Sequence, residues 1–463
     1  VRTYFGAFYL YLGLACVLLV LTVALSPCGK YKLGQPNEKP AFNRLAWISM
    51  LYSAGMGAGI LLRAVQEPVF MLQNPPLRTE ATAEIIALEF TFYQWGFTAW
   101  AFYAIFALAI GYAIFKRKLP VATSSCFARL FKKEKSKRAS RIFMGIDMLT
   151  ILTTVFGLVA ALGLGASQIK GGLNHLFNAD FSYVIIIVLV LLIGILALLS
   201  ALSGVEKGIK AISSFNIYLT VSLLLFVFLQ SDTLAILQSF GEASYRYIID
   251  FIPMSLAIGN YDPGEQFLTD WTYYYWAFWL AWAPFTGIFI ARISQGRTLR
   301  EIIIGVLLLP SLGTFFWFST FGESAFTMIE NWGTYQGEFD NVFTSIFKFL
   351  ENYPLQAIVN SVVILLLVSF LVTSVDSAIY VLSMFTDKRP DPGRMHRIFW
   401  GIALMVFSVA IVLLGQARQD SDVLSAMQKL LIITSLPLSL LMVLMIALWL
   451  MDLWFWKTDL KAE

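Results

Sequence analysis

Histidine and cysteine are scarce in this sequence, with two and three occurrences among 463 residues. Cys16, Cys28 and Cys126 lie far apart and form no CxxC or Cys/His spacing, so zinc, a redox pair and a disulfide framework are not indicated. With only His175 and His396 available, a histidine-based metal site or general base is also disfavoured. These scarcities argue against an enzyme.

Charged residues are scarce as well. They make up 13% of the chain, against roughly 25% in soluble domains, whereas 58% of the residues are hydrophobic. The net charge of +4 gives no reason to expect a nucleic-acid partner. The composition therefore predicts a protein embedded in a lipid bilayer.

Long apolar runs supply the first positive signal, because a membrane-spanning helix needs about 20 apolar residues. Eleven stretches qualify, near 6–27, 46–73, 86–115, 142–167, 182–203, 211–229, 268–293, 299–320, 355–384, 396–415 and 428–454. The segment 236–259 mixes apolar with charged residues and predicts an amphipathic helix at the membrane surface.

The distribution of Lys and Arg predicts the orientation, since these residues gather on the cytoplasmic side. The loop 116–141 holds ten of them, and alternation from there places 25 of the 33 basic residues inside. This topology predicts an inner-membrane protein whose C-terminus is cytoplasmic. It also puts Val1 outside, so we expect a preceding segment with one more span.

Two of the spans carry helix-breaking residues at matching places. GMGAG occupies 55–59 in the second span and WAPFTG occupies 282–287 in the seventh. Interrupted helices in corresponding positions of two halves point to an inverted-repeat transporter with its site at the bilayer midplane. Close packing of small residues is the competing explanation for the glycines.

The predicted units are 1–44 (helix and loop), 45–232 (first five-helix repeat), 233–262 (surface helix), 263–456 (second repeat) and 457–463 (C-terminus).

Aromatic residues cluster near both interruptions, in QWGFTAWAFY (94–103) and WTYYYWAFWLAWAPF (271–285). Tryptophan often belongs to the interfacial belt, which accounts for Trp271 and Trp276. Trp279 and Trp282, in contrast, lie at the second predicted break. A cage of such rings can hold a quaternary ammonium group by cation–π attraction, about 2 kcal/mol or more for a desolvated ring.

Several motifs resemble the betaine/choline/carnitine transporter family. They are GMGAG with the following EP, QWG at 94–96, DWTYYYWAFWLAWAPFTGIFIARISQGRTLREI at 270–302, KYKLGQPNEKPAF at 30–42, LGLGASQI at 162–169, SGVEKGIK at 203–210 and FLVTSVDSA at 370–378. The resemblance covers nearly the whole chain in the family's order. It implies an all-α polytopic membrane protein with the LeuT-like 5+5 inverted-repeat fold and two broken helices. The resemblance also implies a possible homotrimer, because members of the family form trimers.

The resemblance also implies a substrate site. The family's aromatic cage corresponds to Trp95, Trp100, Tyr103 and Trp279, and the neighbouring residues Phe278, Trp282 and Phe289 are expected along the substrate path. Choline carriers of the family often place an acid where this chain has Gly59. Its glycine favours a zwitterionic or anionic solute over choline.

The family's sodium site near the first broken helix corresponds to backbone carbonyls of Ser53 and Met56 with the Phe-x-x-Thr-Ser motif at Phe370, Thr373 and Ser374. Hydrogen bonds back to the helix are the competing explanation for the two hydroxyls. Sodium-independent exchangers carry a basic side chain at the position of Ile217, so sodium coupling is favoured here. The second sodium site corresponds to Thr154, Leu158 and Phe285, and it lacks one hydroxyl ligand.

Arg63 departs from the family, which usually has a bulky aromatic residue there. It follows Gly59 by four residues, on nearly the same helix face and about 6 Å along the axis. One interpretation is an internal ion pair with Glu67, one further turn along. The other is attraction of a carboxylate or sulfonate group of the solute. Gln94 and Ala99 are further departures near the cage.

Together these patterns predict a sodium-driven symporter, not an enzyme, for a small zwitterion of the betaine type, working by alternating access. A membrane enzyme or sensor is disfavoured because His, Cys and acidic clusters are absent. Two alternatives remain among transporters. One is a related carrier for a more anionic carboxylate or sulfonate solute selected by Arg63. The other is a sodium-independent exchanger.

Overall fold

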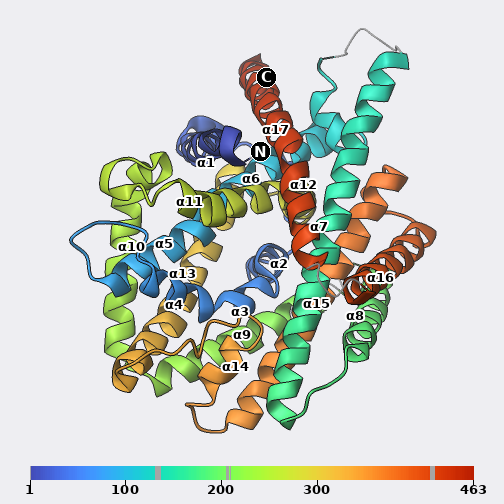
Figure 1. Ribbon diagram of the computed structural model, residues 1–463. Helices are drawn as coiled ribbons and strands as arrows, with labels where there is room; N and C mark the ends of the chain where they lie inside the picture. The colour runs from blue at the N-terminus through green and yellow to red at the C-terminus, as the bar shows by residue number, and fades with distance from the viewer. Residues whose placement is uncertain (1, 131–136, 205–207, 209, 418–422, 463) are drawn as a thin grey trace.

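The computed structural model describes residues 2–130, 137–204, 208, 210–417 and 423–462 (Figure 1). The regular elements in those ranges are helices, and their only β pairing is an isolated bridge between Lys32 and Thr298. The all-α prediction is therefore confirmed.

Within the described residues, ten stretches are long and apolar enough to cross a membrane, and they coincide with ten of the eleven predicted spans. The helices that form them are α1 (Arg2–Leu25), α5 with α6 (Ala83–Trp95 and Phe97–Gly111), α7 (Lys137–Phe177), α8 (Val184–Ser203), α9 (Lys210–Gln230), α12 (Tyr273–Ile293), α13 (Leu299–Trp332), α15 (Gln356–Asp387), α16 (Arg394–Ala417) and α17 (Val423–Ala462).

The one remaining predicted span, near 46–73, is a helix broken into three pieces. They are α2 (Arg44–Met56), α3 (Gly59–Arg63) and α4 (Gln66–Gln73). The first break falls at Gly57, whose φ of 52° is a left-handed conformation that only glycine adopts easily. In Figure 1 these short helices lie near the centre of the molecule. The interruption predicted at 55–59 is confirmed.

The interruption predicted at 282–287 is wrong, because α12 continues from Tyr273 to Ile293 with Pro284 inside it. A proline in a helix removes one backbone hydrogen bond. Here α12 is buried along most of its length and packs more extensively against α6 than any other pair of helices packs. We infer that this packing holds the helix together at the proline.

An interruption that the sequence analysis missed separates α5 from α6 at Gly96, which has φ −95° and ψ −135°. A Cβ atom at this position would lie 2.6 Å from the Phe92 carbonyl oxygen and 2.7 Å from the Tyr247 hydroxyl oxygen. The backbone N–H of Phe97 donates a hydrogen bond of 2.9 Å to Tyr247 Oη. A side chain from another helix thus replaces a helical hydrogen bond that the break removes.

Tyr247 belongs to α10 (Thr233–Leu256), the helix predicted at the membrane surface. One face of α10, including Tyr247 and Phe251, is buried against α5 and α13, while Tyr245, Ile248 and Ile252 are exposed. A helix therefore exists in this segment, while its amphipathic character and its position at the interface stay predictions. Short elements α11 (Glu265–Phe267) and a π-helical turn (Leu268–Thr272) lead from it into α12.

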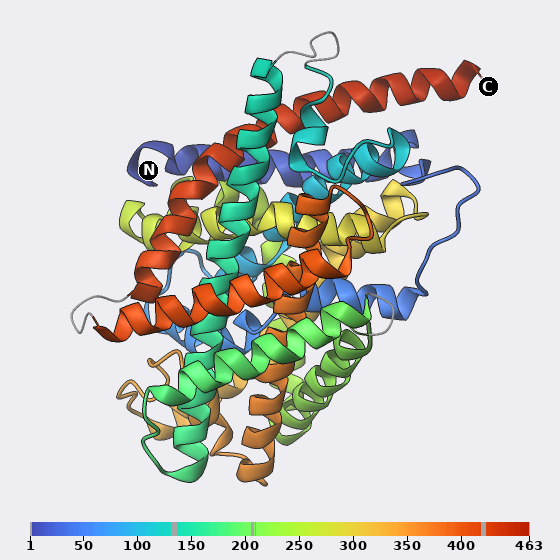
Figure 2. The ribbon, with the colours of Figure 1, turned by 90° about the vertical axis from the view of Figure 1, so that its right-hand side faces the viewer.

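Two groups of helices enclose the centre of the molecule. The piece α4 packs with α5 and α13, which belong with α6 and α12 to one group, whereas α7, α8, α9, α15 and α16 form the other. The piece α2 contacts both groups, through α12 and α13 on one side and α9 and α15 on the other. Figure 2 shows α7 as a long vertical helix beside α8 and α16. The short helices α3 and α14 (Ser345–Leu350) lie where the groups meet, with α3 in contact with α7. The broken helix therefore lies at the boundary between the groups.

Candidate functional site

A cavity lies at this boundary and encloses about 940 Å³ of empty space, counted with the solvent at its mouth. The break between α2 and α3 contributes Gly57, Ala58 and Gly59 to its wall. Aromatic side chains come from α5, α6 and α12, and smaller side chains come from α7 and α15. Seven predicted substrate residues line it: Gly59, Arg63, Trp95, Tyr103, Phe278, Trp279 and Trp282.

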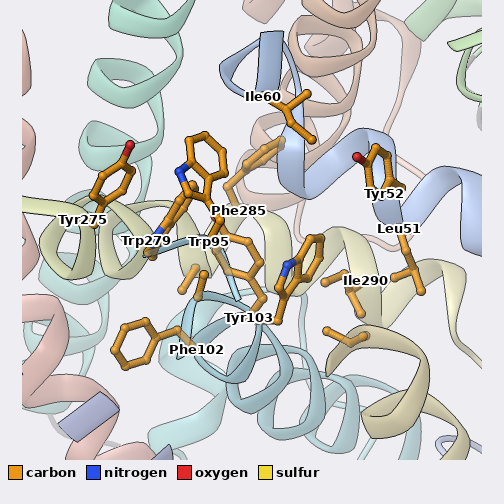
Figure 3. Close-up of a cluster of buried hydrophobic side chains, with 14 of the residues drawn as sticks. Leu51, Tyr52, Ile60, Trp95, Phe102, Tyr103, Tyr275, Trp279, Phe285 and Ile290 are labelled. Carbon is orange, nitrogen blue, oxygen red and sulfur yellow. The ribbon is translucent and has the colours of Figure 1, made fainter. Parts of the chain in front are cut away.

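Trp279 is at the centre of the aromatic part of the wall. Its ring centroid lies 5.3 Å from that of Trp95, 6.2 Å from that of Tyr103 and 5.8 Å from that of Tyr275. The Tyr103 ring stands at 90° to the indole, and Figure 3 shows these side chains gathered together. The Trp279 indole N–H donates to the Gln94 carbonyl oxygen at 3.0 Å, which fixes the ring.

Two of the predicted residues, Trp100 and Phe289, are buried but do not line the cavity. Trp100 lies behind Tyr103, with ring centroids 5.5 Å apart and the planes nearly perpendicular. It therefore supports a cage ring. The difference arises because residues five positions apart on a helix point about 140° away from each other, so Trp95 and Trp100 do not share a face.

Tyr274 and Tyr275 line the cavity and were missed by the sequence analysis. The helical spacing could have predicted them, because residues four positions apart lie on the same helix face. Tyr275 precedes Trp279 by four residues, and Tyr274 precedes Phe278 by four. The ring centroids of these pairs are 5.8 Å and 6.2 Å apart. The run TYYYW therefore continues the aromatic wall by one further turn.

Glu67 is fully buried behind this wall and joins two of its members. Its Oε1 accepts a hydrogen bond from Trp95 Nε1 at 3.1 Å, and its Oε2 accepts one from the Tyr275 hydroxyl. The carboxylate therefore ties α4 to α5 and α12. Both of its oxygen atoms are engaged by aromatic side chains.

Arg63 lines the cavity and forms no salt bridge with Glu67, which was one of its two interpretations, although the two groups still interact electrostatically. Arg63 Nη1 donates to Gln66 Oε1 at 2.6 Å, and its guanidinium carbon lies 5.5 Å from the Trp271 ring centroid. The helix interruption between α3 and α4 separates the two residues. A regular helix with four-residue spacing, assumed in the sequence analysis, does not occur here.

One residue of the first predicted sodium site, Ser374, lies at the same helix break. A Cβ atom at Gly57 would lie 3.2 Å from Ser374 Oγ, so α15 approaches the break closely at this point. Ser374 lines the cavity. Ser53 and Met56 belong to the last turns of α2, and their side chains lie outside the part of the chain that the structure describes.

Thr373 makes the hydrogen bonds back to its own helix that were considered as the alternative. Its hydroxyl donates to the carbonyl oxygen of Phe370 at 2.9 Å. Asn216 Nδ2 on α9 donates to Thr373 Oγ1 at 3.1 Å. The hydroxyl is thus held from two helices, next to Ser374 at the break.

The predicted second sodium residues also come together. Thr154, Leu158 and Phe285 line one small space of about 190 Å³ between α7 and α12. Thr154 donates its hydroxyl to the Thr150 carbonyl oxygen at 2.8 Å, and Leu158 adds only hydrocarbon. The oxygen donors that Na⁺ requires are therefore sparse at this place.

The sequence model of the BCCT, betaine/carnitine/choline family transporter, matches residues 1–455. The chain is 38% identical to the glycine betaine transporter OpuD of Bacillus subtilis over 448 residues, which are 96% of this chain and 85% of that protein. It is 35% identical to the betaine/ectoine transporter LcoP of Corynebacterium glutamicum over 444 residues, which are 94% of this chain and 69% of that protein.

Among solved structures, MhsT in complex with L-phenylalanine superimposes with a TM-score of 0.55, covering 89% of this chain and 90% of that one. The sequence identity is 15%, so the similarity concerns the fold alone. It confirms the LeuT-like fold predicted from the sequence.

Proposed function

We propose that this chain, which belongs to the betaine/carnitine/choline transporter family, takes up a small zwitterionic solute of the betaine type together with Na⁺. Membership of the family and the LeuT-like fold establish the broader class, a secondary transporter of betaine-type solutes that is embedded in a membrane. The proposal adds the charge of the solute and the coupling ion.

The aromatic cavity at the broken helix is the observation that supports this solute. The faces of Trp95, Tyr103 and Trp279 suit a trimethylammonium group, which has no hydrogen-bond donor and binds aromatic rings by cation–π attraction. Glu67 lies behind the rings with both oxygens engaged, and Gly59 provides no acid. A solute that carries its own negative charge therefore suits the cavity better than a pure cation.

The approach of Ser374 to Gly57 supports sodium coupling. Breaking a helix frees backbone carbonyl oxygens, which cost several kcal/mol each in a membrane unless they are satisfied. These oxygens and the hydroxyls of Thr373 and Ser374 make a hard oxygen shell suited to a small cation. Because ion and solute would occupy neighbouring positions, each should strengthen the binding of the other.

Uptake into proteoliposomes tests this function. We expect glycine betaine to accumulate when a sodium gradient is imposed, and the double variant Thr373→Ala/Ser374→Ala to abolish the sodium-dependent part. Ser383→Ala is the matched control, because Ser383 is also buried on α15 but only bonds back to the Ile379 carbonyl oxygen. Equal uptake with and without sodium would instead support a sodium-independent exchanger.

A second candidate is a carrier of more anionic solutes, and the position of Arg63 favours it. The guanidinium lines the cavity without a direct ion pair to Glu67, so its charge is available to a carboxylate or sulfonate. Arg63→Phe should then weaken anionic solutes at least tenfold and leave glycine betaine unchanged or improved, in competition against labelled substrate. Equal weakening of all solutes would mean that Arg63 acts only in packing.

A further inference from the structure

Gln168 is a buried glutamine on α7 and belongs to the wall of the aromatic cavity. Its side chain is 0% exposed, it lines the cavity, and neither Oε1 nor Nε2 has a hydrogen-bond partner. It belongs to the motif LGLGASQI, to which the sequence analysis assigned no role, and it comes from a different helix than the rings of α5 and α12.

An unpartnered carboxamide in such a place is costly. Burying an amide without hydrogen bonds costs roughly 1–3 kcal/mol by mutational measures, so buried polar groups in proteins nearly always have partners. The other residues that α7 contributes to the cavity wall are Ala160, Ala161, Leu164 and Gly165, which offer no polar side-chain atom. The missing partner must therefore come from what occupies the cavity.

We propose that Gln168 is a specificity-determining residue that hydrogen-bonds the carboxylate end of the solute. The inference rests on the proposed function and deepens it, because it assigns the two ends of the zwitterion to two walls. The rings of Trp95 and Trp279 hold the trimethylammonium end, and Nε2 of Gln168 donates to the carboxylate. A carboxamide donates two hydrogens and carries no charge, so it accepts an anionic group without requiring a counter-ion when the cavity is empty.

Binding to the purified protein in detergent tests the assignment, with glycine betaine and tetramethylammonium as paired probes. Both present a quaternary ammonium to the rings, but only glycine betaine has a carboxylate. We expect Gln168→Leu to weaken glycine betaine by roughly 10- to 100-fold, the range for a hydrogen bond to a charged group. Tetramethylammonium should bind within about twofold of its original affinity.

Gln168→Glu gives a second, independent readout. It keeps the size of the side chain but places a carboxylate opposite the carboxylate of the solute. We expect glycine betaine to bind still more weakly than to Gln168→Leu, and the cation choline to bind as well as before or better. Asn360→Leu is the matched control, because Asn360 is a buried amide with an unpartnered Oδ1 on α15, outside the cavity wall.

Three results would overturn the assignment. Equal weakening of both probes by Gln168→Leu would make Gln168 a packing residue, and unchanged binding of glycine betaine would remove it from the site. Equal weakening of glycine betaine by Asn360→Leu would mean that any buried amide has this effect. Failure of the unaltered chain to bind either probe would instead contradict the proposed function, so the two failures are distinguishable.

Discussion

The indole Nε1 of Trp95 donates a hydrogen bond to Glu67 Oε1 across 3.1 Å, and the opposite oxygen of the same carboxylate accepts the hydroxyl of Tyr275. Two cavity-lining rings from different helices are thus positioned by one buried acid. The acid itself is not among the residues of the cavity wall.

Glu67→Leu should weaken every quaternary ammonium ligand by a similar factor, roughly tenfold. The substitution leaves the Trp95 N–H and the Tyr275 O–H without acceptors, which costs about 1–3 kcal/mol for each buried group and lets the rings move. Tryptophan fluorescence titrations with glycine betaine and tetramethylammonium measure the effect. Glu67→Gln, which keeps one acceptor oxygen, should be intermediate, and loss confined to one ligand would contradict a positioning role.

Gly59→Asp should shift the preference from glycine betaine towards choline. A Cβ atom at Gly59 would lie 3.3 Å from the Trp95 ring, so a small side chain fits with a slight adjustment and its carboxylate would enter the cavity. Competition by the two ligands against the same labelled substrate measures the ratio, which we expect to change at least tenfold. Gly59→Asn controls for size, and an equal change in that variant would exclude a charge effect.

Gly287→Ala should lower the melting temperature of the protein. The new Cβ atom would lie 2.4 Å from Phe106 Cβ and 3.0 Å from the Ala107 backbone nitrogen, which forces α12 away from α6. Overpacking of this kind costs about 1–3 kcal/mol. Thermal unfolding in detergent measures it, with Gly241→Ala on α10 as the control, because nothing lies within 4 Å of that position. Equal melting temperatures for the two variants would contradict the close approach.

Tyr247→Phe should destabilise the protein by about 1–3 kcal/mol, because the backbone N–H of Phe97 loses its acceptor at the Gly96 break. The same thermal unfolding measurement applies. Tyr245→Phe on the same helix is the matched control, since Tyr245 is 65% exposed. An effect of similar size in both variants would place the loss in α10 itself and not at the break.

Local patterns predicted much of this molecule. Hydropathy located the membrane-spanning helices, because each span must satisfy its backbone within its own segment and cover it with apolar side chains. The glycines at 55–59 located one break correctly, since a left-handed residue such as Gly57 follows from residue type. The aromatic run of α12 likewise indicated Trp279 and Phe278 as cavity residues.

Other features depended on neighbours that are distant in sequence. Pro284 signals a break by itself, but the packing of α12 against α6 keeps the helix continuous. The break at Gly96 exists together with a hydroxyl from Tyr247, 150 positions away. Arg63 and Glu67 have the spacing of an ion pair, yet the helix is interrupted between α3 and α4, and Arg63 bonds to Gln66 instead.

The sequence by itself determined the membrane class, the family, the aromatic cavity and the first broken helix, because these follow from residue types and their spacing along one segment. Only the tertiary structure decided which rings face the cavity, that Glu67 stands behind Trp95, and that Gln168 faces the cavity without a partner. The physical reason is that side-chain hydrogen bonds and burial depend on which helices meet. That meeting is set by packing across the whole chain and not by any one segment.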